Sequence, residues 1–292
     1  MLENEMRNKL DRQLIWWILI VCFAYHYKVI ACGFFGVVLG YSGLCGTLVH
    51  GITTNHWFET LVYCPLMWFA MNEINETVFF PEKKGGYNLR RLRTKRIGQL
   101  LCALYLFGMG VHVTNTIEIY SRVHLGIEEG ALYDQIYWID EDLSHWIQFG
   151  AFFLAMSWFV AFDRLDRTHG SYVAIFTGVA HGLERGIGVI EGNSSGMAIV
   201  LCSFIIIATV YRWYRHDQNF KRAWADFFFR HGLTFALCIP LTFLSYSWTF
   251  GGMVQPSHMG NDAWKVVAFS ALFIGVGFFV GLGIDRALGN RN

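Results

Sequence analysis

The chain of 292 residues contains 54% hydrophobic and 17% aromatic residues, but only 15% charged residues and four prolines. A soluble domain of this length is rarely so apolar, so the composition predicts a polytopic membrane protein and excludes an ordinary soluble enzyme. The net charge of +1 and the scattering of the basic residues among short loops give no reason to expect a nucleic-acid partner. The seven cysteines show no CxxC spacing, so the sequence predicts neither a disulfide framework nor a cysteine-based zinc site.

Runs of mostly apolar residues recur along the chain, and a helix needs about 20 such residues to cross a bilayer. Eight runs have this length: 14–38, 57–80, 97–119, 138–162, 171–190, 196–213, 225–249 and 263–285. Residues 14–56 allow either one span with an outer loop or two short spans broken near Lys28, so nine spans are the alternative. The pattern predicts an all-α polytopic transmembrane helix bundle, with residues 1–292 forming a single integral membrane domain.

Lysine and arginine residues gather in every second connection between these runs. The basic residues of these connections are Lys83, Lys84, Arg90, Arg91, Arg93, Lys95, Arg96, Arg164, Arg167, Arg212, Arg215, Lys221, Arg222, Arg286 and Arg291. The intervening connections, near 120–137, 191–195 and 250–262, hold almost no positive charge. Because short cytoplasmic loops of membrane proteins are enriched in lysine and arginine, we expect the basic connections and both termini to be cytoplasmic.

Three successive predicted spans, 97–119, 138–162 and 171–192, carry acids and histidines where a membrane helix ordinarily has neither. Side chains three, four or seven residues apart share one face of a helix. This spacing predicts three polar stripes, formed by His112, Asn115 and Glu118, by Glu141 and His145, and by His181, Glu184, Gly188 and Glu191. Charged groups at membrane depth usually face the interior of a bundle, so these three helices are the predicted functional helices.

The depth of each polar residue follows from its distance along its span. At 1.5 Å per residue, His112, His145, His181 and Glu184 come to lie about 15–26 Å above the cytoplasmic ends of their helices. The acids Glu118, Glu141 and Glu191 come out near the outer surface. The sequence therefore predicts a polar pocket that opens outward. Three more histidines could complete the pocket, and they are His26, His50 and His56.

Negative groups outnumber positive groups in the predicted pocket. Against Arg185 stand five carboxylates, which are Glu118, Glu141, Asp142, Glu184 and Glu191. Protons, water or a bound cation must balance the surplus. Histidine nitrogen and carboxylate oxygen are ligands for zinc, non-haem iron and manganese, and helix bundles place such ligands on facing helices. The predicted metal ligands are His112, Glu141, His145, His181 and Glu184, and the metal is left open among iron, zinc, copper and manganese.

An outward-facing site of this kind predicts a membrane-embedded metalloenzyme that oxidises or hydrolyses a lipid-like or small apolar substrate. An open coordination position on the metal would activate water or oxygen. In this interpretation Glu118 and Glu191 at the mouth of the pocket are the catalytic residues, and Asn115 and Arg185 orient the groups that bind the cofactor. The expected partners are the lipid bilayer, the lipid-like substrate, and other membrane proteins or further copies of the chain in a homo-oligomer.

Three other interpretations account for part of the pattern. The same acids and histidines could transport a proton or a metal cation, although the sequence shows no duplicated halves or paired broken helices. Two of the histidines could bind haem in an electron-transfer protein, which leaves the neighbouring acids unexplained. Finally, Arg185 could tie Glu184 or Glu141 into a hydrogen-bonded network that binds no ligand.

Overall fold

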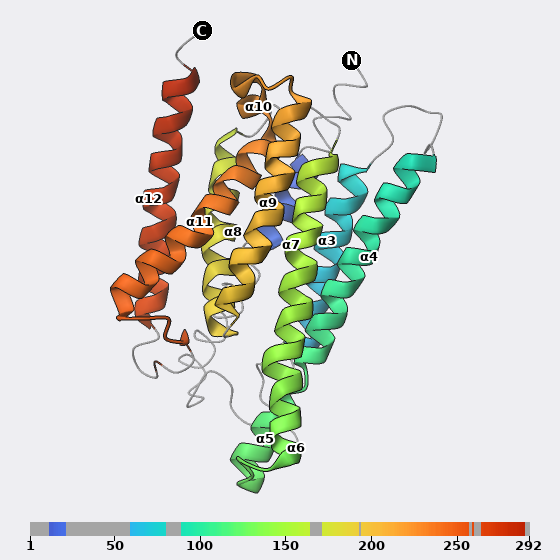
Figure 1. Ribbon diagram of the computed structural model, residues 1–292, viewed down its shortest axis with the longest axis vertical. Helices are drawn as coiled ribbons and strands as arrows, with labels where there is room; N and C mark the ends of the chain where they lie inside the picture. Colours follow the sequence, from blue (N-terminus) through green and yellow to red (C-terminus); the bar gives the residue numbers. More distant parts are fainter. Residues whose placement is uncertain are drawn as a thin grey trace.

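The computed structural model describes residues 12–21, 59–79, 89–163, 171–192, 194–256, 259 and 264–289. These residues form a bundle of helices (Figure 1). Six of the described helices are long and apolar enough to cross a membrane, which indicates an integral membrane protein and confirms the predicted helical bundle. The eight or nine spans stay a prediction, because most of the run 14–38 lies outside the described residues.

From residue 57 onward, each predicted apolar run corresponds to a helix. A short helix at residues 12–21 precedes them. The later elements are η2 (Glu59–Tyr63), α3 (Cys64–Val78), α4 (Leu89–His112), α5 (Asn115–Leu125), α6 (Ala131–Tyr137), η3 (Trp138–Ser144), α7 (His145–Phe162), α8 (Ser171–Glu191), α9 (Ser195–Arg215), α10 (Phe220–Ala225), α11 (Phe227–Phe250) and α12 (Trp264–Gly289), where η marks a π-helix. The run 57–80 becomes η2 and α3, which together are not among the six membrane-length helices.

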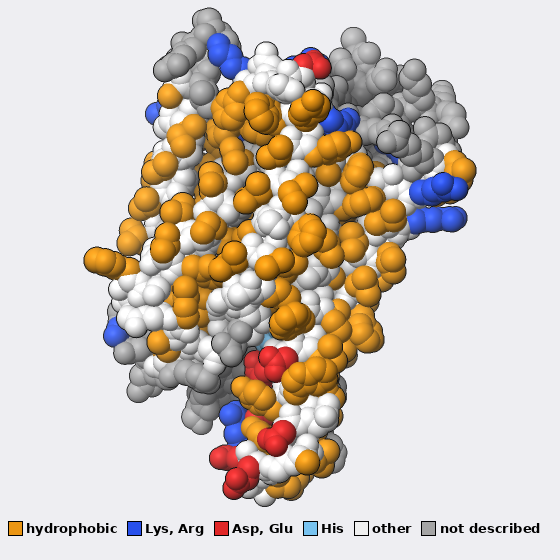
Figure 2. Space-filling view, in the orientation of Figure 1, with side chains coloured by type: hydrophobic (Ala, Val, Ile, Leu, Met, Phe, Trp, Pro, Cys, Tyr) orange, Lys and Arg blue, Asp and Glu red, His pale blue; other side chains and the backbone are white. Residues whose placement is uncertain are grey.

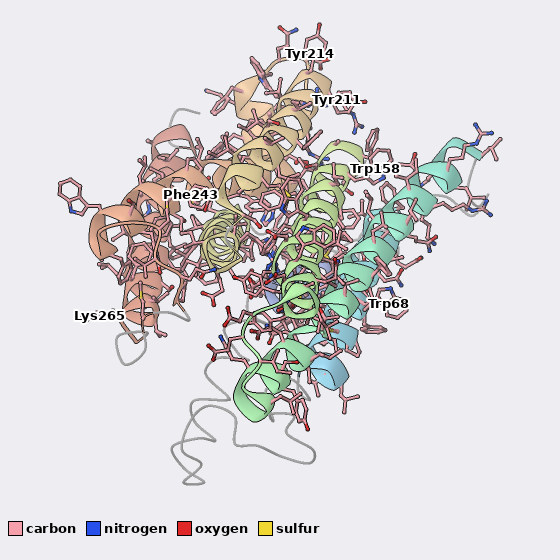
Figure 3. All side chains as sticks on the ribbon, turned by 60° about the horizontal axis from the view of Figure 1, so that its bottom comes forward. Trp68, Trp158, Tyr211, Tyr214, Phe243 and Lys265 are labelled. Atoms are coloured by element: carbon pink, nitrogen blue, oxygen red, sulfur yellow. The ribbon has the colours of Figure 1, made fainter. Side chains whose placement is uncertain are left out.

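The two ends of the bundle differ in charge. Figure 2 shows that the lysine and arginine side chains on this face lie mostly toward the upper end, whereas the aspartate and glutamate side chains gather at the lower end, around α5 and α6. Hydrophobic side chains cover the surface between them. Tyr211 and Tyr214 lie on the last turn of α9 beside Arg212 and Arg215 (Figure 3), an arrangement typical of helices that end at a membrane interface.

The central helix α8 packs closely on α11 because glycines line its contact face. A Cβ atom added at Gly178 would lie 2.7 Å from the carbonyl oxygen of His231, and one at Gly182 would lie 2.9 Å from that of Phe235. At Gly186 an added Cβ would lie 2.8 Å from Thr242. Small residues spaced four apart let helix backbones approach in this way. These glycines therefore allow the close packing of α8 on α11.

A second group of close contacts involves α12, which packs against α8. An added Cβ atom at Gly277 would lie 2.7 Å from Val179, and one at Gly281 would lie 2.2 Å from Ile175. Gly275 and Gly283 of the same helix have no atom of the described residues within 4 Å of such a Cβ. Gly277 and Gly281 therefore lie at the contact with α8, whereas Gly275 and Gly283 do not contact the described part of the chain.

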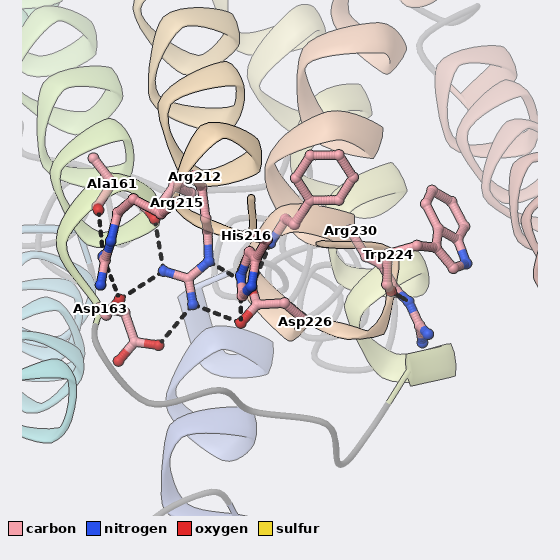
Figure 4. Close-up of polar contacts among 10 residues, drawn as sticks. Ala161, Asp163, Arg212, Arg215, His216, Trp224, Asp226 and Arg230 are labelled. Carbon is pink, nitrogen blue, oxygen red and sulfur yellow. Dashed lines mark hydrogen bonds and ion pairs between the residues drawn. The ribbon is translucent and has the colours of Figure 1, made fainter. Parts of the chain in front are cut away.

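A buried arginine ties three helix ends together at the basic end of the bundle (Figure 4). Arg212 of α9 donates to both carboxylate oxygens of Asp226, from Nε at 2.5 Å and from Nη2 at 2.6 Å. It also donates to the backbone carbonyls of Val160 and Asp163, at 2.9 Å and 2.8 Å, where α7 ends. Asp226 in turn caps α11, accepting from the backbone N–H of Phe229 at 2.9 Å. One side chain thus fixes the relative positions of α7, α9 and α11.

Candidate functional site

The predicted site residues lie in two clusters along the core of the bundle. The first, the π-helix cluster, contains His112, Asn115, Asp140, Glu141, Ser144 and His145. The second, the mid-bundle cluster, contains Thr177, His181, Glu184, Arg185 and His231. His145 stacks on Phe149, whereas His181 contacts Phe152. His145 itself and Phe152, the contact of His181, are seven residues apart on α7, which corresponds to about 10 Å along the helix.

The π-helix cluster forms where two helices depart from regular α geometry. The chain between α4 and α5 makes tight turns, in which the N–H groups of Val113 and Thr114 bond to carbonyls only three residues earlier. Opposite this break, η3 carries Asp140, Glu141 and Ser144 in a π-helical segment. Such segments inside α-helices occur frequently at functional sites. The two irregular segments bring His112, Asn115 and Asp140 into contact.

Asp140 is the centre of the π-helix cluster, and it is completely buried. One carboxylate oxygen lies 2.8 Å from Nδ1 of His112, and the other accepts a hydrogen bond of 2.6 Å from the side-chain amide of Asn115. Its backbone carbonyl accepts a hydrogen bond from the hydroxyl of Ser144. The carboxylate therefore holds the His112 ring with the hydrogen on Nδ1 and the lone pair on Nε2.

His145 is oriented in the same manner by its own helix. Its Nδ1 lies 2.6 Å from the backbone carbonyl of Glu141, which accepts the ring hydrogen. The carboxylate of Glu141 lies 3.7 Å from the same nitrogen. The imidazole packs against Gly192, the residue after α8, where an added Cβ atom would come within 2.8 Å of the ring. The ring centroids of His145 and His112 are 4.8 Å apart, so the two imidazoles are neighbours.

The mid-bundle cluster joins α8 to α11 through two histidines. Nδ1 of His231 lies 2.9 Å from the hydroxyl of Thr177, and Nε2 of His231 lies 3.3 Å from Nδ1 of His181. Next to them, Arg185 contacts Glu184 at 3.3 Å and lies over the ring of Phe152, 4.0 Å from its centroid. The structure contains the contact between Arg185 and Glu184 that the sequence analysis gives as one alternative.

The structure brings together only some of the residues that the sequence assigns to one pocket. His112, Asn115, Glu141 and His145 are together, whereas His181, Glu184 and Arg185 belong to the mid-bundle cluster. Two further acids, Glu118 and Glu191, lie near enough to Glu141 of the π-helix cluster to act on it electrostatically. Glu118 accepts a hydrogen bond of 2.5 Å from the hydroxyl of Tyr133, and the backbone carbonyl of Glu191 accepts one of 2.5 Å from Gln255. The three additional histidines, His26, His50 and His56, lie outside the described residues.

Sequence reasoning missed two residues that organise the clusters. Asp140 stands where a helix is expected to enter the membrane, and such acids ordinarily face water. His231 follows Arg230 near the basic end of a run that otherwise resembles structural support. Neither role follows from the sequence without the irregular geometry of the α4–α5 connection and of η3, and without the packing of α11 on α8.

Within the described part of the chain, no three histidine, cysteine, aspartate or glutamate side chains are arranged to hold a metal ion. The predicted five-ligand set of His112, Glu141, His145, His181 and Glu184 therefore does not converge on one point there. No protein-family model, no curated protein and no solved structure matches the chain. The function must consequently be argued from the geometry of the two clusters.

Proposed function

We propose that the chain is a membrane-embedded metalloenzyme whose metal ion is bound by Nε2 of His112 and Nε2 of His145. The observation that carries the proposal is that each ring has Nδ1 beside a fixed oxygen acceptor, the carboxylate of Asp140 or the carbonyl of Glu141. Histidines that bind metals almost always donate their other ring hydrogen in this way. The ring hydrogen bonds thus prepare both Nε2 atoms to act as ligands.

The spacing of the two rings fits a shared ion. Two imidazoles bound to one tetrahedral ion at nitrogen distances of about 2.0–2.1 Å have ring centroids about 5 Å apart. The centroids of His112 and His145 are 4.8 Å apart. Glu141 lies beside His145, and a side-chain rotation could add its carboxylate as a third ligand. Water and substrate would occupy the remaining coordination positions of the metal ion. A bound metal would supply Lewis-acid or redox chemistry there.

The surroundings favour a lipid-like or small apolar substrate. The side chain of His112 is 21% exposed, so the cluster is reachable from outside the bundle. Trp138 and Trp146, on the same continuous helix as His145, are exposed, as is usual for tryptophan at a membrane interface. With the basic end of the bundle on the cytoplasmic side, this site would open at the outer face. We also propose that Glu118 and Glu191 act as acid–base residues at its mouth.

The metal content of the detergent-purified protein tests the proposal. We expect about one iron, zinc, copper or manganese ion per chain, measured by inductively coupled plasma mass spectrometry, as for a single mononuclear site. The variants His112→Ala and His145→Ala should lose the ion, because each removes a ligand. The matched variant His216→Gln changes a histidine at the opposite end of the bundle and should retain it.

Two results would contradict the metalloenzyme proposal. A wild-type protein without bound metal, even after incubation with each of the four ions, would exclude the site. Metal retained by the double variant His112→Ala/His145→Ala would place the ion elsewhere. The absorption spectrum of the same sample adds a further check, because a Soret band would show haem in place of a metal ion bound by the protein alone.

A further inference from the structure

The mid-bundle cluster contains a chain of hydrogen bonds whose direction can be deduced. The hydroxyl of Thr177 donates to the backbone carbonyl of Val173 at 2.8 Å, so its oxygen accepts from Nδ1 of His231. With its hydrogen on Nδ1, His231 has a lone pair on Nε2 and accepts from Nδ1 of His181. His181 therefore carries its own lone pair on Nε2. Every ring hydrogen in the chain points the same way, from His181 toward Thr177.

The series of hydrogen bonds begins at Nε2 of His181, an acceptor that has no hydrogen bond within the described residues. His181 is completely buried, and among the described residues Nε2 has no hydrogen-bond partner. Oε2 of Glu184, one turn along the same face of α8, also has none within that part of the chain. Nε of Arg185, which the structure likewise leaves without a described partner, supplies a donor beside them. Buried polar atoms of this kind are ordinarily satisfied by water, which can donate to both acceptors and accept from the arginine.

The cluster also lies between the two polar ends of the bundle. Toward the basic end, His231 stands five residues after Asp226, which lies 3.9 Å from His216. Toward the acidic end, Glu184 stands seven residues before Glu191 on α8, and the π-helix cluster lies beyond Phe149. Titratable groups therefore follow one another through the middle of the bundle, with aromatic side chains between them.

We propose that the bundle conducts protons between its two ends, and that Glu184, His181 and His231 are the relay at its centre. Carboxylates and histidines inside membrane spans form such relays in pumps and transporters. This activity is separate from metal chemistry at His112 and His145, which belong to the other cluster. The protons are delivered to and removed from the relay by water at either side.

Each passage through the relay conserves protons. A proton held by Glu184 passes through water to Nε2 of His181, and the ring releases its Nδ1 proton to Nε2 of His231. His231 then releases its Nδ1 proton to the hydroxyl oxygen of Thr177. The hydroxyl hydrogen of Thr177, which the carbonyl of Val173 accepts in the structure, leaves to water toward the basic end after the hydroxyl has turned away from that carbonyl. No covalent bond other than those to hydrogen changes. The rings and the hydroxyl must then turn back, since each hydrogen has moved to the opposite side.

The groups that face the relay from the packed helices set its electrostatics. The positive charge of Arg185 on α8 disfavours a second positive charge on His181. The carboxylate of Glu184, 3.3 Å from the guanidinium, partly cancels this repulsion. From α4, Tyr105 lies close to Arg185 and Glu184. From α7, the relay meets Phe152, and from α11 it meets Phe235. Gln148 and Tyr63 lie beside Tyr105.

Proton flux into liposomes tests the relay. Purified full-length protein is reconstituted into phosphatidylcholine liposomes that contain the pH-sensitive dye pyranine, and valinomycin with a potassium gradient imposes an inside-negative potential. We expect the interior to acidify faster with the wild-type protein than in protein-free liposomes. The variants Glu184→Gln, His181→Gln and His231→Gln should each fall to the protein-free rate. Glu76→Gln, a matched substitution in the ion pair with Lys95 between α3 and α4, should keep the wild-type rate.

Three results would overturn the relay. One is a wild-type rate no higher than that of protein-free liposomes, which needs no variant and so does not depend on their folding. Another is a wild-type rate retained by all three relay variants after each has been shown by size-exclusion chromatography to be monodisperse. The third is an equal loss in Glu76→Gln, which would show that flux reflects general damage. Metal content, measured on the same samples, reports separately on the proposed enzyme site.

Discussion

Replacing Asp140 by alanine is expected to lower the affinity of the π-helix cluster for its metal ion by about 10–100-fold, the usual cost of removing a carboxylate that orients a histidine ligand. One carboxylate oxygen of Asp140 lies 2.8 Å from Nδ1 of His112, the other accepts a hydrogen bond of 2.6 Å from Asn115, and the residue is completely buried. Without it, the His112 ring loses the acceptor that keeps its lone pair on Nε2. His112 is still present in this variant, but the orientation and the tautomer of its ring are no longer fixed.

The affinity can be measured by competition between the protein and a metal-binding dye, with the apo protein in detergent. Asp134→Ala is the matched control, because Asp134 is an exposed aspartate on α6, one element before Asp140, and its loss should leave the dissociation constant unchanged. If Asp140→Ala binds metal as tightly as the wild-type protein, the hydrogen bond to His112 has no role in metal binding, and the argument from ring orientation fails.

Replacing Arg212 by methionine is expected to lower the free energy of unfolding by about 3–5 kcal/mol, as is typical when one partner of a buried ion pair is removed. Methionine fills part of the space of the arginine side chain but leaves Asp226 and Asp163 without their guanidinium. Asp226 accepts two hydrogen bonds from Arg212 and caps α11 as well. The loss therefore affects the ends of α7, α9 and α11 together.

Unfolding of the purified protein, followed by circular dichroism during thermal or SDS titration, measures this difference. Arg222→Met serves as the control, because the ion pair of Arg222 with Asp217 is exposed, with side-chain exposures of 59% and 84%. Exposed ion pairs contribute about 0–1 kcal/mol, so this variant should unfold close to the wild type. Equal stability of the two variants would mean that the Arg212 network does not hold the helix ends together.

Hydropathy predicts most of the bundle because a membrane helix must be both long and apolar. The run 138–162 corresponds to η3 and α7, which together cover residues 138–162, and the run 171–190 corresponds to α8 at Ser171–Glu191. The run 97–119 is different, since α4 ends at His112 and the chain turns before α5 begins. Helical period and composition do not locate such a break, because the residues on both sides of it are helical.

The candidate site is less predictable because helical spacing describes one helix at a time. Spacing places His112 with Asn115, and Glu141 with His145, and these groups do lie together. It gives no account of the register between helices, on which the pairing of His181 with His231 depends. The close approach of α8 and α11 at Gly178 and Gly182 produces that pairing. The π-helical turn that buries Asp140 is likewise a local distortion that no periodicity predicts.

The ligands of the bound metal can be determined directly by extended X-ray absorption fine structure on the loaded wild-type protein. Two imidazole ligands, with metal–nitrogen distances of about 2.0–2.1 Å if the ion is zinc, are expected, together with oxygen from Glu141, water or both. In His145→Ala the imidazole contribution should fall by half, if the ion is retained at all. A spectrum that shows only oxygen or sulfur neighbours, or an imidazole signal unchanged in His145→Ala, would contradict a site formed by His112 and His145.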